Sequence, residues 1–209
     1  MEPVSDINVG TLERRLFSYK ERSYGSLLLT SVATAVAVFL GFYVSLLETS
    51  APVAFEDQMA IERAIDILDE RGFDAEVFLL RKTASYRSTD HWFNGIILKE
   101  NAYAATNFPF QIITVYPDFY DKAVDDVERA MILLHEARHL QAKDEADAYA
   151  YVWQNRERLG WTQLSHGTTP TYITIEEETR SIAPDLFACP QNLWNDCTED
   201  KLGNYRVAE

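Results

Sequence analysis

Hydrophobic residues are spread unevenly along this chain, and its longest stretch without a charged residue lies near the start. Residues 23–47 contain no Asp, Glu, Lys or Arg and are rich in Leu, Val, Ala and Phe. A helix needs roughly 20 apolar residues to cross a bilayer, whereas the apolar core of a cleaved signal peptide has only about 7–15. The pattern therefore predicts an uncleaved transmembrane helix over residues 23–47.

The residues that flank this span predict its orientation. Four Lys or Arg lie in residues 1–22, and Arg63 alone lies within about 20 residues after the span. Because basic flanks stay on the cytoplasmic side, we expect a cytoplasmic N-terminal segment and an extracytoplasmic C-terminal domain. The absence of an Asn-x-Ser/Thr sequence favours a bacterial periplasm or cell surface. Small residues at Ala33, Ala37 and Gly41 have a spacing that would let two such helices pack as a homodimer.

Shorter apolar patterns follow a linker at residues 48–55 and divide the domain 56–209 into segments. Apolar residues at helical spacing predict helices, and short apolar runs bounded by Gly or Pro predict strands. The predicted helices cover residues 56–70, 123–141, 145–159 and 174–186, and the predicted strands cover residues 76–80, 95–106 and 111–116. The segments 84–94, with His91 at the surface, and 161–171, with His166, are predicted loops. This mixture predicts an α+β domain with a short β-sheet.

The composition narrows the range of functions. The 209 residues carry a net charge of −14 and have a sequence pI near 4.7. Binding to nucleic acid phosphates needs a basic surface, so we expect no nucleic acid partner. A hydrophobic content of 47% is sufficient for a buried core.

The predicted helix over residues 123–141 contains an H-E-x-x-H pattern formed by His135, Glu136 and His139. The two histidines lie one turn apart on the same helix face, where both imidazoles can bind one zinc ion. Glu136 lies to the side of that face, within reach of a metal-bound water. The other residues of this helix are mostly apolar, so we expect it to be buried, and buried polar side chains need partners or a metal ion. The pattern is therefore interpreted as a metal site.

A catalytic zinc ion usually has a third protein ligand, and an acidic stretch follows the second histidine. On one unbroken helix none of its carboxylates would share the face of the histidines. We therefore expect a break near residues 142–144, with Asp144 as the N-cap of the next helix. Glu145 is the predicted third ligand and Asp147 the alternative. Arg138 is expected to pair with a carboxylate.

These motifs resemble the zincin superfamily of metallopeptidases, and within it the gluzincins, whose third ligand is a glutamate. The segment from Glu145 to Tyr149 is similar to the Glu-x-x-Ala pattern, followed by Asp or Tyr, of their second helix. The resemblance covers residues 56–188 and implies a sheet edge, residues 96–103 here, that binds an extended peptide. Only five residues separate His139 from Glu145, which is tighter than in most gluzincins.

The resemblance implies a membrane-anchored zinc metallopeptidase that acts on a peptide or protein substrate. Glu136 would be the general base. The anionic intermediate needs another hydrogen-bond donor, and His166, next to Gly167, is the first candidate, ahead of Tyr149 and Tyr172. A second interpretation is a metal-containing ectodomain that binds a peptide or partner without hydrolysis. A third is a structural domain in which the motif is coincidental.

The two cysteines, Cys189 and Cys197, lie close together near the C-terminus. Disulfides form and persist on the oxidising side of a membrane. If the C-terminal domain is extracytoplasmic, we expect these residues to form a disulfide.

Overall fold

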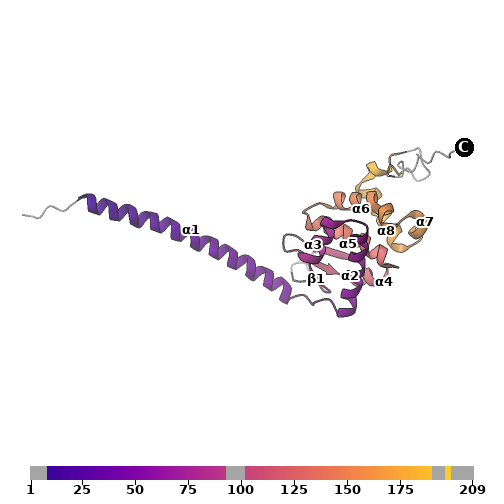
Figure 1. Ribbon diagram of the computed structural model, residues 1–209, viewed down its shortest axis with the longest axis horizontal. Coiled ribbons are helices and arrows are strands. Elements are labelled where there is room, and N and C mark those ends of the chain that lie inside the picture. The colour runs from indigo at the N-terminus through magenta and orange to yellow at the C-terminus, as the bar shows by residue number, and fades with distance from the viewer. Residues whose placement is uncertain (1–8, 93–101, 190–195, 199–209) are drawn as a thin grey trace, which may run out of the picture. The chain divides into compact units, whose positions relative to one another are not determined.

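The computed structural model describes residues 9–92, 102–189 and 196–198, and the chain divides into two compact units, Met1–Glu48 and Thr49–Glu209. The described part of the first unit is one helix, α1 (Val9–Glu48) (Figure 1).

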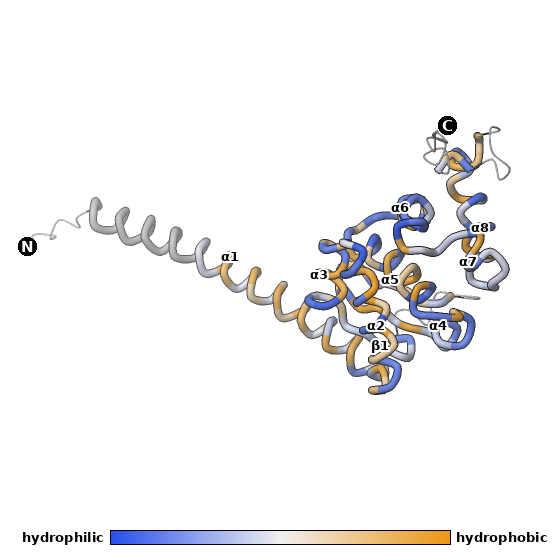
Figure 2. Tube along the Cα trace, turned by 45° about the vertical axis from the view of Figure 1, so that its right-hand side comes forward, coloured by the Kyte–Doolittle hydropathy of each residue, from blue (hydrophilic) through white to orange (hydrophobic). Residues whose placement is uncertain are grey.

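Helix α1 is apolar on all sides in its second part. Leu27, Leu28 and Leu29 follow one another around the helix and are 58%, 69% and 71% exposed. Figure 2 shows hydrophobic residues along this part of the helix. Among the described helices, Tyr24–Glu48 is the one that is long and apolar enough to cross a membrane. Length and composition alone are compatible with a membrane span, and a signal sequence near the N-terminus can pass the same test.

The described part of the second unit is mostly helical and contains one small sheet. Its helices are α2 (Phe55–Glu70), α3 (Asp74–Lys82), α4 (Pro117–Asp121), α5 (Asp126–Leu140), α6 (Glu145–Leu159), α7 (Gln163–His166) and α8 (Pro170–Ile182), followed by the 3-10 helix η2 (Pro184–Phe187). Strands β1 (Ser85–Arg87), β2 (Ala104–Asn107) and β3 (Ile112–Val115) lie in the order β1-β3-β2. β1 is parallel and β2 antiparallel to β3, so β2 is an edge of the described sheet. The α+β class is confirmed.

Helix α5 is at the centre of the second unit, in contact with α2, α3, α6 and β2 (Figure 1). Leu133, Leu134 and Ala137 are fully buried, because this helix is apolar on most of its faces. The predicted buried helix is therefore confirmed. It begins at Asp126 because the side chain of Asp125 accepts hydrogen bonds from backbone N–H groups of the first turn.

The strand predicted at residues 76–80 is wrong, because this segment belongs to α3. Val77 and Leu80 are buried while Phe78, between them, is 59% exposed. Burial at this spacing is that of a helix rather than the alternation of a strand. Acidic residues in the first turn and basic residues in the last turn also favour the helix. A short apolar run does not separate the two structures by itself.

The sheet differs from the prediction in its extent. Residues 95–101 of the predicted strand 95–106 lie outside the described residues, and the described strand begins at Ala104. The predicted strand 111–116 is confirmed as β3. The predicted loop 84–94 contains β1. The surface position predicted for His91 is wrong: this residue is buried, and its Nε2 lies 3.2 Å from Nδ2 of Asn107 at the end of β2.

The last helices begin at capping residues that the predicted boundaries missed. α7 lies within the predicted loop 161–171. α8 begins at Pro170, not at residue 174, because the side chain of Thr169 caps it and Pro170 fits the first helical turn. Helix α6 was predicted with its observed bounds, and Gly160 ends it in the left-handed conformation, with φ 79°.

The predicted disulfide between Cys189 and Cys197 is confirmed. Asp196, the residue before Cys197, is buried, and its carboxylate pairs with Arg156 of α6 at 2.8 Å. The backbone N–H of Cys197 donates to the carbonyl of Leu186 at 2.7 Å. The segment next to the disulfide is therefore fixed against α6 and η2.

Candidate metal centre

The two histidines of the motif face each other across one turn of α5. Nε2 of His135 and Nε2 of His139 are 3.0 Å apart. Nδ1 of His139 lies 2.9 Å from the carbonyl oxygen of Lys143, so Nδ1–H donates a hydrogen bond to this carbonyl and Nε2 is left to bind a metal ion. A histidine that binds a metal ion usually has such a partner on its other nitrogen, which fixes its orientation.

A tight turn after α5 reverses the chain. Ala142 has φ 59°, and its N–H donates to the carbonyl of His139 at 2.9 Å, as residues after a helix C-terminus commonly do. The side chain of Asp144 then caps α6 by accepting from the N–H of Asp147 at 2.9 Å. The predicted break in the helix and the predicted N-cap are both confirmed. The reversal sets the first residue of α6, Glu145, opposite the histidines of α5.

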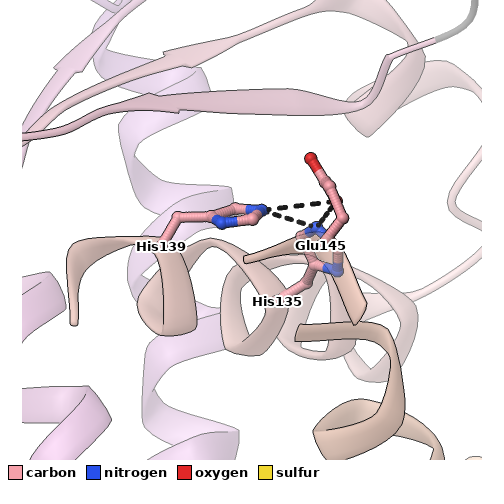
Figure 3. Close-up of side chains that lie close together, drawn as sticks. All are labelled: His135, His139 and Glu145. Atoms are coloured by element: carbon pink, nitrogen blue, oxygen red, sulfur yellow. Dashed lines mark hydrogen bonds and ion pairs between the residues drawn. The ribbon is translucent and has the colours of Figure 1, made fainter. Parts of the chain in front are cut away.

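Glu145 completes a group of three donor atoms (Figure 3). Its Oε2 lies 3.2 Å from Nε2 of His135 and 3.5 Å from Nε2 of His139. Two ligands held about 2.0 Å from one ion at the tetrahedral angle are about 3.3 Å apart. Because all three separations are close to this value, His135, His139 and Glu145 could hold a metal ion, and two imidazoles with one carboxylate are a donor set that zinc accepts.

The charges of this group are coupled in the metal-free protein. Hydrogen bonds from His135 and His139 hold the pKa of Glu145 far below its usual range. Burial lowers the pKa of His139, but its hydrogen bond with Glu145 and the nearby carboxylate of Glu136 outweigh burial and raise this pKa to about 9. A metal ion at the site would therefore replace a proton on His139 at neutral pH.

The alternative ligand, Asp147, has another partner. Its Oδ1 accepts hydrogen bonds from Nε and an Nη atom of Arg138, at 2.8 and 2.6 Å. The guanidinium of Arg138 also lies over the ring of Tyr151, 4.2 Å from its centroid. The expected pairing of Arg138 with a carboxylate is confirmed. This ion pair joins α5 to the first turn of α6.

Glu136 is buried and lies beside the edge strand of the sheet. Its Oε2 accepts a hydrogen bond of 2.7 Å from the hydroxyl of Thr106 in β2. The peptide-binding edge is expected at residues 96–103, of which 96–101 lie outside the described residues. The described edge strand, β2, begins at Ala104, directly after this range. No pattern in the sequence indicated a role for Thr106, because its approach to Glu136 depends on how β2 packs on α5.

A cavity of about 830 Å³ opens at the three donor atoms. Residues 102–106 and Phe108 line it on the sheet side, and residues of α5, α6, α8 and the turn between α5 and α6 line the rest. Tyr149 is one of them, and its ring packs edge-on against His135 with the centroids 4.6 Å apart. Burial, followed by the charges of Glu145 and Glu178, raises the pKa of Tyr149, so its hydroxyl keeps its proton and can donate a hydrogen bond.

The other two candidate donors do not line the cavity. His166 was expected as the first candidate, but its Nε2 lies 3.0 Å from Oδ2 of Asp125, which caps the start of α5. The rise of the helix from there to His135 is about 15 Å. Tyr172 is buried against Trp153 and Trp161. The structure therefore brings Tyr149 to the candidate metal centre, and His166 and Tyr172 have structural partners elsewhere.

Comparison with known proteins gives no match: no family model, no curated protein and no solved structure is similar to this chain. The class of the protein therefore follows from its own residues. It is an α+β domain that follows one apolar helix and contains a His-His-Glu group that could hold a metal ion.

Proposed function

We propose that this chain is a membrane-anchored, zinc-dependent metallopeptidase. The observation that carries the proposal is the convergence of His135, His139 and Glu145, whose donor atoms lie within 4.8 Å of one another. The buried carboxylate of Glu136 lines the same cavity as these donors. Three ligands together with an acid–base group in one cavity are the parts that zinc-dependent hydrolysis requires.

Zinc bound to these ligands would supply a Lewis acid and lower the pKa of its water to about 7. Glu136 takes the proton of the attacking water and returns it to the nitrogen of the leaving amine. Thr106 binds one oxygen of Glu136 and so orients the carboxylate, with the other oxygen left for this proton. Tyr149 donates to the carbonyl oxygen as negative charge develops there.

The position of strand β2 favours a peptide as the substrate. It is an edge of the described sheet, and edge strands offer unpaired N–H and C=O groups to an extended chain. The residues of β2 and the two before it line the cavity up to Thr106. A peptide added along β2 would therefore pass Glu136 and the candidate metal centre.

The apolar helix favours the proposal that the chain is anchored in a membrane. It is long and apolar enough to span a bilayer from Tyr24 to Glu48, and the excess of Lys and Arg before it favours a cytoplasmic N-terminus. The disulfide between Cys189 and Cys197 favours an oxidising, extracytoplasmic location for the second unit.

The test is a comparison of the full chain with Glu136→Gln, both in detergent and supplied with zinc, on a mixture of unmodified peptides. We expect the variant to keep its zinc and to lose at least about 100-fold in turnover, since it lacks the general base. Arg63→Gln is a control at an exposed ion pair outside the cavity. Equal cleavage by the wild type and Glu136→Gln contradicts this mechanism. Zinc-dependent peptide binding without cleavage by either protein would instead favour a non-hydrolytic binding domain.

A further inference from the structure

One carboxylate of the cavity has no partner among the residues that the structure describes. Glu136 is bound by Thr106, and Glu145 lies against the two histidines. Glu178 also lines the cavity, but among residues 9–92, 102–189 and 196–198 none forms a hydrogen bond or ion pair with it. Lys143, the basic residue of the lining, does not pair with it either.

Glu178 lies next to apolar residues of the cavity lining. It is on α8, one turn after Ile175, and both residues line the cavity. Ile175 and Val152, the lining residue of α6 nearest the core, are 7% and 0% exposed. Glu178 itself is exposed, and it lines the same cavity as Tyr149 and His135. The carboxylate is therefore solvated and borders the same cavity as the candidate metal centre.

We propose that this cavity selects peptides with a basic side chain, Lys or Arg, and that Glu178 is the residue that selects them. The inference rests on the proposed peptide substrate of the same site. A long basic side chain can place its methylene groups along apolar surface while its charged end stays in water. Here the methylene groups would lie along Ile175, and the cation would pair with Glu178. The net charge of −14 also favours cationic ligands at long range.

The experiment measures binding and so does not depend on cleavage. The full chain with Glu136→Gln, in detergent and with zinc, is incubated with two pools of end-blocked peptides that carry either lysine or norleucine at one fixed position. Norleucine has the lysine stem without its amine. Retained peptides are counted by mass spectrometry. We expect the lysine pool to be retained about three- to tenfold better, the range of a solvated ion pair.

The neighbouring Glu177 provides a matched control, because it is exposed on the same helix but does not line the cavity. Adding Glu178→Gln should remove the preference for lysine, and adding Glu177→Gln should leave it unchanged although the net charge is the same. Equal effects of the two variants, no preference for lysine, or no retention of either pool overturns the inference. If the wild type cleaves no peptide but the preference is lost only in Glu178→Gln, the hydrolytic function fails and the selectivity stands.

Discussion

At the scale of single residues, the proposed mechanism gives Tyr149 the role of donor to the developing oxyanion. Its ring lies against His135 and its hydroxyl stays protonated. We expect Tyr149→Phe to retain zinc and to lower kcat about 100-fold, as the loss of one donor to an oxyanion does. Tyr103→Phe changes another tyrosine of the cavity and should cost less than about threefold. Similar values of kcat for wild type and Tyr149→Phe would show that Tyr149 has only a packing role.

The raised pKa of His139 predicts that metal binding depends on pH. Its pKa is raised to about 9 in the metal-free protein, so His139 carries a proton at pH 7–8 that zinc must displace. Displacement of this proton should raise the affinity for zinc about tenfold per pH unit up to about pH 9. Titration calorimetry in buffers of different ionisation enthalpy should detect at least about one proton released per zinc at pH 7.5, from His139 and in part from the zinc-bound water. Zinc binding without proton release would contradict the coupling of His139 to Glu145.

At the scale of elements, the turn between α5 and α6 decides whether the site forms. Ala142 has φ 59°, a conformation that glycine adopts at lower cost than alanine. We expect Ala142→Gly to stabilise the second unit by about 0.5–1 kcal/mol, to be measured by urea unfolding.

Ala146→Gly is the control for this change, because Ala146 is exposed in the first turn of α6. There the same substitution should lower the free energy of unfolding by up to about 1 kcal/mol, since glycine is unfavourable in a helix. A loss of stability in Ala142→Gly would mean that this turn has another conformation.

The local parts of the site were predictable from the sequence. Two histidines four apart on an apolar helix follow from helical geometry alone, and Asp144 marked the break that allows Glu145 to turn back. Thr106 and Glu178 could not be found in this way, because they reach the cavity from β2 and α8 through tertiary packing. The segment 76–80 was assigned to a strand because its composition is compatible with both structures, and burial on one helix face decided between them.

At the scale of the whole molecule, the disulfide and the apolar helix make a joint prediction about location. If the second unit is extracytoplasmic, Cys189 and Cys197 should be oxidised in intact cells. A maleimide added to denatured extracts should label the chain only after reduction, and Cys189→Ser should expose one reactive thiol without reduction. Labelling of the wild-type chain without reduction would place the domain in a reducing compartment, with the opposite orientation.

The central claim is that His135, His139 and Glu145 bind zinc, and the metal content of the full chain tests it most directly. Protein purified in detergent without chelators, then supplied with zinc and dialysed, should contain about one zinc ion per chain. Asp147→Asn should retain about one, whereas Glu145→Gln should retain less than about a tenth after the same dialysis. A zinc-free wild type would contradict the metal centre. Loss of zinc in Asp147→Asn but not in Glu145→Gln would contradict the choice of Glu145 as the third ligand.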